Sequence, residues 1–76
     1  MNIKDIRKVS TDLTLSEIET CVEKVATHKK DKSCPMISFD DLIKAEYVRR
    51  LMENENMKQN EAIRKLASNI RNIQTN

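Results

Sequence analysis

At 76 residues, the chain is long enough for one domain with a thin core. It contains no glycine and one proline, which disfavours hairpin-rich sheets and glycine-loop nucleotide sites. A formal net charge of +2 excludes a polybasic tail, and no apolar run approaches the ~20 residues of a membrane-spanning helix. We therefore expect one helical domain over residues 1–76, with a cytoplasmic location because no secretory signal is visible.

The first predicted helix covers residues 2 to about 12. Ile3, Ile6 and Val9 recur at near-helical spacing, and Asp5 suits the positive end of the helix dipole. A helix this short is marginal by itself, so we expect it to pack against another helix.

The second predicted helix runs from Leu15 to about Lys29. Thr14 and Glu17 have the spacing of a capping box. Positive charge at the carboxyl end, from His28 onward, suits the helix dipole. One apolar stripe follows the cap along Leu15, Ile18, Cys21, Val22, Val25 and Ala26.

Residues 30–37 are the predicted linker. This segment holds the only proline, Pro35, which disfavours helix at Cys34 and removes a backbone N–H. We expect a hinge here between two halves of the molecule.

The third predicted helix begins after Ser38, a good N-cap, and ends near residues 53–54. Asp40 and Asp41 fall in its first turn, where acidic side chains favour the dipole. Its apolar face is wide, which indicates contact with more than one neighbour. That face comprises Leu42, Ile43, Ala45, Tyr47, Val48, Leu51 and Met52.

The fourth predicted helix starts near residue 57, after an asparagine-rich turn over residues 54–56. Asn56 together with Gln59 is a candidate cap for it. Its apolar stripe comprises Ile63, Leu66, Ala67, Ile70 and Ile73.

These elements predict an all-α fold of four short helices, arranged as two helical hairpins. Because a chain this small is short of core, we also expect a dimer, or a monomer with one apolar face left for a partner. The predicted core comprises Ile6, Leu15, Ile18, Val22, Val25, Leu42, Ile43, Tyr47, Leu51, Ile63, Leu66 and Ile70.

Candidate catalytic and metal-binding residues are few. His28, the only histidine, is interpreted as a solvated residue at a helix end. Cys21, His28 and Cys34 lack the paired short spacing of a zinc site. In a cytoplasmic protein both cysteines are expected to be reduced thiols. A redox role for Cys34, which has lysines nearby, stays open.

The neighbouring acids Asp40 and Asp41 are explained by their place at a helix start rather than by acid–base or metal chemistry. We therefore predict a protein that is not an enzyme, with no cofactor, no metal and no small-molecule substrate.

Two surfaces are candidates for binding. The apolar one, on the third helix, comprises Leu42, Ile43, Tyr47, Leu51 and Met52. The basic one, for nucleic acid or an acidic partner, comprises Arg49, Arg50, Lys58, Arg64, Lys65 and Arg71.

Residues 40–73 resemble the helical part of ribbon-helix-helix repressors, from Asp40-Asp-Leu-Ile through Arg50-Leu-Met-Glu-Asn-Glu-Asn-Met-Lys-Gln-Asn-Glu-Ala-Ile-Arg. The resemblance implies a strand at residues 36–39 that pairs with the same strand of a second chain and enters the major groove of DNA. It also implies that Met57, Lys58 and Gln59, at the start of the second helix, lie near phosphates.

Residues 6–25 resemble the oligomerisation region of the histone-like nucleoid-structuring proteins. The matching residues are Ile6-Arg7, Asp12-Leu-Thr-Leu15 and Glu23-Lys24-Val25. This resemblance implies two short helices that pack against a second chain. Because the DNA-binding domain of that family has no counterpart here, it also implies a modulator of such a system.

The function expected from the sequence is a small regulatory protein that acts through helix-mediated protein contacts. We expect a modulator or inhibitor in transcription or nucleoid regulation, with self-association and no membrane partner. The alternative is a small dimeric DNA-binding regulator that uses the basic side of the C-terminal helix.

Overall fold

A computed structural model describes residues 2–29 and 31–74, and the side chains of residues 2–29 and 31–70. It contains four helices in this order: α1 (Ile3–Asp12), α2 (Leu15–Ala26), α3 (Phe39–Asn54) and α4 (Gln59–Gln74). No strand occurs in the part of the chain that the structure describes. The predicted all-α fold of four helices is therefore confirmed.

The predicted starts of α2 and α3 are confirmed by their caps. At α2, the Glu17 N–H donates to Thr14 Oγ1 over 3.2 Å, and the Thr14 N–H donates to Glu17 Oε1 over 2.9 Å. At α3, the Ser38 hydroxyl accepts from the Asp41 N–H over 3.2 Å. Each bond satisfies an amide that the helix itself leaves without a partner.

The predicted end of α2 near Lys29 is wrong, because the helix ends at Ala26. His28 adopts a left-handed conformation with φ 60°, and its N–H donates to the Val25 carbonyl. The Lys29 N–H then donates to the Lys24 carbonyl over 2.8 Å. This pair of bonds is a Schellman motif, which turns the chain away from the helix axis.

The turn before α4 also differs from expectation. Asn56 is left-handed, with φ 53°, in the turn after α3. Gln59, predicted to help cap α4, instead donates from Nε2 to the Arg7 carbonyl and to Ser10 Oγ, both over 2.8 Å. This side chain therefore ties the start of α4 to α1.

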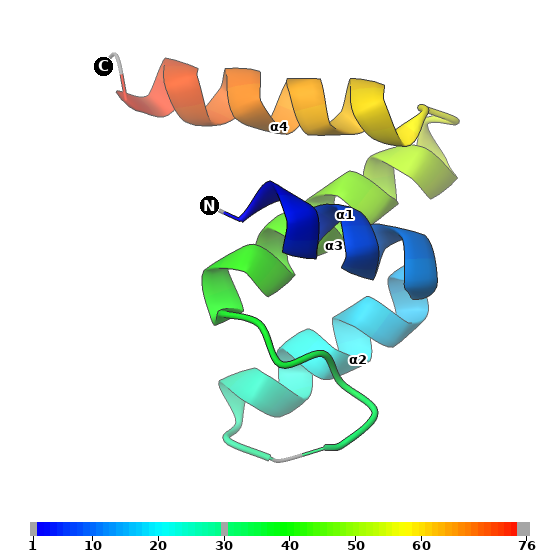
Figure 1. Ribbon diagram of the computed structural model, residues 1–76, viewed down its shortest axis with the longest axis vertical. Helices are drawn as coiled ribbons and strands as arrows, with labels where there is room; N and C mark the ends of the chain where they lie inside the picture. The colour runs from blue at the N-terminus through cyan, green and yellow to red at the C-terminus, as the bar shows by residue number, and fades with distance from the viewer. Residues whose placement is uncertain (1, 30, 75–76) are drawn as a thin grey trace.

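Helix α3 is the central element, because α1, α2 and α4 each pack against it. Figure 1 shows α2 at one end of the long axis, α4 at the other, and α3 running between them with α1 alongside. The expected pair of hairpins is thus better described as three helices arranged around a fourth.

Half of the residues predicted to form the core are buried, and two of the predicted residues are exposed instead. Val25 and Ile43, both expected inside, are 37% and 42% exposed. Leu15, Val22, Tyr47 and Ile70 are only partly buried. The buried apolar residues are Ile6, Val9, Ile18, Cys21, Leu42, Ala45, Val48, Leu51, Ala62, Ile63 and Leu66.

An ion pair on α3 joins the ends of α1 and α2. Arg49 Nη1 donates to the Ser10 carbonyl over 3.0 Å, in the last turn of α1. Arg49 Nε donates to Glu53 Oε2 over 2.6 Å, and that same carboxylate oxygen accepts from the Leu15 N–H over 2.8 Å. One side-chain pair thus supplies partners to two helix termini that lack intrahelical ones.

Candidate functional site

The most distinctive local feature is a disulfide between Cys21 and Cys34. Cys21 lies in the core on α2, 5% exposed, and Cys34 lies in the loop that leads to α3. Their Cα atoms are 5.6 Å apart. The expectation of two reduced thiols is therefore wrong for this structure, because the turn after α2 brings the loop back over the helix and the two side chains meet.

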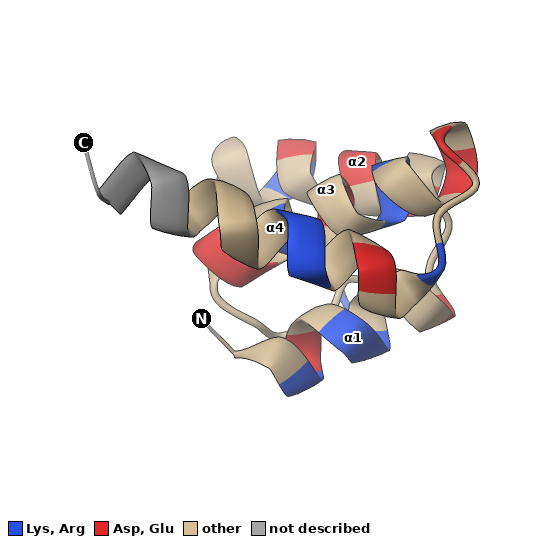
Figure 2. Ribbon diagram, turned by 90° about the horizontal axis from the view of Figure 1, so that it is seen from above, with Lys and Arg blue, Asp and Glu red and all other residues tan. Residues whose placement is uncertain are grey.

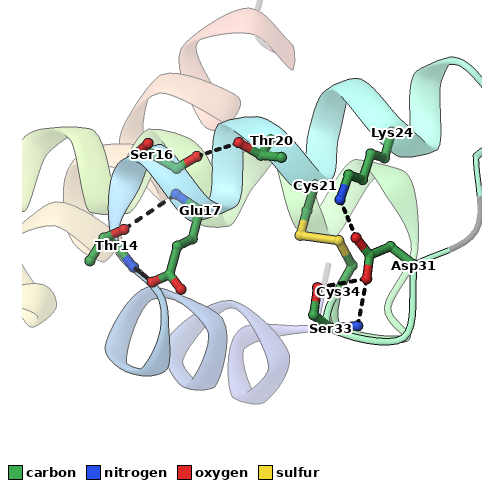
Figure 3. The surroundings of a disulfide bond; sticks show 9 residues. All are labelled: Thr14, Ser16, Glu17, Thr20, Cys21, Lys24, Asp31, Ser33 and Cys34. Atoms are coloured by element: carbon green, nitrogen blue, oxygen red, sulfur yellow. Dashed lines mark hydrogen bonds and ion pairs between the residues drawn. A yellow bond between two sulfur atoms is a disulfide. The ribbon is translucent and has the colours of Figure 1, made fainter.

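A second link holds the same loop. Figure 3 shows Lys24 of α2 pointing toward Asp31, with which it forms an ion pair. Asp31 Oδ1 also accepts from the Ser33 N–H over 2.8 Å and from the Ser33 hydroxyl over 2.6 Å. The Lys24 ammonium and the two Ser33 donors hold the pKa of Asp31 well below its usual range. Its negative charge is therefore kept and is matched by Lys24.

Residues 31–37, the described part of the predicted linker, are thus attached to α2 at two points. The disulfide fixes Cys34, and the Lys24 ion pair fixes Asp31. Cys34 and Ile37 are also partly buried against the core. These attachments oppose the hinge motion that was expected of this segment.

A groove lies between this loop and the end of α2, and we call it the loop groove. It is open, mostly apolar in its lining, and has a volume of about 820 Å³. Its apolar lining comes from Val25, Cys34, Pro35 and Met36, and its polar lining from His28, Lys29, Asp31 and Lys32. Met36 is fully exposed, at 102% of its reference area.

A second groove lies on the other side of the same loop, toward α1. It has a volume of about 450 Å³. The residues that it shares with the loop groove are Lys32, Cys34, Pro35 and Met36. Its polar lining includes Asp5 and Asp12 from α1 as well as Lys8 and Lys32. The loop therefore forms a ridge with a groove on each side, and Met36 lies on that ridge.

The predicted apolar partner surface on α3 is mostly interior. Leu42 and Leu51 are 1% and 7% exposed, so they are out of reach of a partner in this fold. Tyr47 and Met52 pack partly buried against the core, and the Tyr47 hydroxyl accepts from Asn69 Nδ2 over 2.6 Å. Only Ile43 of that set is exposed.

The predicted basic residues divide into two groups. Arg49 is engaged with Ser10 and Glu53, as described above, and Arg50 Nη2 donates to Glu46 Oε1 over 2.7 Å. The remaining described members, Lys58, Arg64 and Lys65, are exposed. The side chain of Arg71 lies outside the described residues.

Figure 2 shows how the basic residues are distributed on the face of the molecule that carries α1 and α4. Lysine and arginine positions occur on both α1 and α4, and acidic positions lie between them. Arg7 of α1 donates to Asn60 of α4 over 2.8 Å, so it is partly engaged within the chain. The basic positions are therefore interrupted rather than joined into one continuous face.

The other candidate residues have structural roles. The Asp41 side chain is buried and accepts from the Asn2 N–H over 3.2 Å, which joins the start of α1 to α3. His28 occupies the left-handed position after α2. Among the described residues, no three His, Cys, Asp or Glu side chains gather where they could hold a metal ion.

Within residues 2–29 and 31–74, no helix is long and apolar enough to cross a membrane. Comparisons with protein-family models, curated proteins and solved structures found no match for this chain.

The loop groove is the site that sequence reasoning missed. Its signal was present, because Met36 follows the only proline and Val25 lies near the end of the apolar stripe of α2. Their juxtaposition required the turn at His28 and the bond between Cys21 and Cys34.

Proposed function

We propose that this chain is a non-catalytic regulatory protein that binds another protein through the loop groove. The observation that carries this proposal is the fully exposed Met36 beside an open, mostly apolar groove. Exposed apolar area of this kind favours burial against a partner. Methionine adapts its shape to different contacts, which suits a protein-binding surface.

The attachments of the loop support this role. Because the disulfide and the Lys24–Asp31 ion pair already order residues 31–36, less conformational entropy is lost when a partner binds. We place the function in transcription or nucleoid regulation, as a modulator or inhibitor. That placement is supported by the resemblances of residues 6–25 and 40–73.

Site-specific crosslinking tests the proposal. A photo-crosslinking amino acid replaces Met36 in the native cell, and a matched variant carries it at Lys65, on the exposed part of α4. We expect a defined protein adduct from position 36 and not from position 65. The adduct protein, once identified and purified, should bind the unmodified chain and bind Met36→Glu more weakly. Absence of any protein adduct at position 36 contradicts the proposal.

Self-association remains part of the proposal, supported by the small core and by Phe39 and Ile43, which are 38% and 42% exposed on α3. Sedimentation at several concentrations measures it. A mass that stays monomeric at the highest concentration rejects it.

The alternative is a DNA-binding regulator, supported by the exposed Lys58, Arg64 and Lys65. Its affinity for duplex DNA should fall steeply with salt, because each phosphate contact releases counterions. Lys58→Glu/Lys65→Glu should then abolish binding. No binding at low salt rejects this alternative.

For the proposed cytoplasmic location, the disulfide has a consequence. Cytoplasmic thiol systems reduce accessible disulfides, so Cys21 and Cys34 should exist there partly as the disulfide and partly as two reduced thiols. Alkylation of thiols in freshly broken cells, followed by mass measurement, gives the fraction that is bonded. A fully bonded population points to an oxidising compartment instead.

A further inference from the structure

The charges around the loop groove are unbalanced. Its polar lining contains Lys29 and Lys32, both exposed, and a single acid, Asp31. Asp31 already forms an ion pair with Lys24. Among residues 2–29 and 31–70, neither Lys29 nor Lys32 has an ion-pair partner. The groove therefore presents net positive charge beside an apolar surface.

The shape of the groove selects among classes of partner. It is open rather than enclosed, so it accommodates a side chain that projects from a longer segment. Pro35, Val25 and Met36 supply apolar contact, and none of them can donate a hydrogen bond from its side chain to a phosphate. The two lysines lie on the same groove, where they can meet carboxylates next to an apolar anchor.

We propose that the loop groove binds an acidic amphipathic segment of a partner protein. An apolar side chain of that segment packs against Val25, Pro35 and Met36, and its carboxylates face Lys29 and Lys32. Amphipathic helices that lay an apolar face into a groove are a recurring mode of peptide recognition. This inference rests on the proposed function and specifies the class of partner.

The neighbouring surfaces fit such a segment less well. The groove toward α1 carries Asp5 and Asp12 beside Lys8 and Lys32, so its charges are mixed. Lys58, directly before α4, and Arg64 and Lys65 on α4 are exposed, and α4 lies at the other end of the long axis from the loop. Charge changes at Lys58 and Lys65 therefore serve as controls for charge changes at the groove.

Two fluorescent helical peptides of about 15 residues test the inference. They share one leucine- and phenylalanine-rich face, and their opposite face carries glutamate in one peptide and lysine in the other. We expect the glutamate peptide to bind, by fluorescence anisotropy, and its affinity to fall as salt rises. Lys29→Glu/Lys32→Glu should weaken this binding about tenfold.

The matched control is Lys58→Glu/Lys65→Glu, which changes the net charge equally and should leave the dissociation constant within about twofold. Met36→Ser should also weaken binding, because it removes apolar contact. Since Met36 is fully exposed, this variant should keep the fold, which circular dichroism and thermal unfolding verify.

Three results overturn the inference. The lysine peptide binds as tightly as the glutamate peptide or more tightly, or both double variants weaken binding of the glutamate peptide equally. The third is that the chain binds vesicles containing anionic lipid and neither peptide. A protein adduct at position 36 combined with any of these leaves the proposed function intact and rejects the acidic partner. Loss of the adduct itself rejects the proposed function.

Discussion

At the scale of single residues, His28 and Asn56 hold left-handed backbone, with φ of 60° and 53°. Glycine usually fills such positions because it has no Cβ to clash with the backbone, and this chain contains none. Both residues follow the end of a helix. The chain therefore ends α2 with a conformation that is unfavourable for histidine, whereas the asparagine after α3 tolerates the left-handed region better.

His28→Gly should raise the free energy of unfolding by about 1 kcal/mol, since the left-handed penalty exceeds the extra chain entropy of glycine. Urea denaturation measures the change. Thr27→Gly is the matched control, because Thr27 has φ −99° and gains nothing from glycine. Equal effects of the two substitutions would refute the strain argument.

The lowered pKa of Glu53 leads us to expect that the stability of the fold depends on pH. Its hydrogen bond from Arg49, and then that from the Leu15 N–H, lower the pKa of its carboxyl group. A pKa that is lower in the folded state adds stability above the unfolded pKa, and this is lost as the pH falls through the folded pKa. The pKa of Asp31 is lowered in the same direction, so both groups favour folding near neutral pH.

We therefore expect the thermal midpoint to fall as the pH is lowered from about 5 to about 2. Glu53→Gln should lower the midpoint at neutral pH and flatten this slope. Glu55→Gln, at an exposed position after α3, removes the same charge and should keep the slope of the unmodified chain. A steep slope that persists in Glu53→Gln would contradict this role.

At the scale of elements, the loop between α2 and α3 depends on its covalent bond. Cys21 and Cys34 are separated by 13 positions, and closing a loop of that size removes entropy from the unfolded chain. Reduction should therefore lower the free energy of unfolding by about 3 kcal/mol.

Urea denaturation with and without a dithiol reductant measures this difference. Cys21→Ala/Cys34→Ala is the control, because its stability should not respond to the reductant. The same reduction should weaken binding of the glutamate peptide, since Cys34 lines the loop groove. Unchanged stability on reduction would contradict the entropic argument.

At the scale of the whole molecule, α3 supplies the contacts that unite the other three helices. Leu42, at 1% exposure, lies in the core, and Ile43 is 42% exposed on the next position of the same helix. A core shared by all four helices predicts that damage to α3 is felt throughout the fold.

Leu42→Ala should lower the free energy of unfolding by about 3 kcal/mol, through lost burial and the cavity that remains. Ile43→Ala, on the same helix, should lower it by less than about 1 kcal/mol. Equilibrium denaturation followed by circular dichroism gives both values. Similar losses for the two variants would show that this core assignment is wrong.

The sequence by itself determined the four helices and the starts of α2 and α3. Thr14 and Ser38 cap α2 and α3 as predicted, because capping depends on residues only three positions apart. Apolar periodicity also located Ile6, Ile18, Leu66 and other buried residues. These signals are local, so they can be read without knowing which helices meet.

The tertiary structure alone decided which side of each helix lies inside and where the loop lies. Helix α3 has apolar residues on a wide face. Its sequence pattern therefore did not predict that Val48 is buried while Ile43 is exposed. Likewise, the spacing of Cys21 and Cys34 did not predict that they bond, because their approach depends on the left-handed turn at His28. The loop groove exists only after that approach, since its walls come from segments that local sequence patterns do not relate.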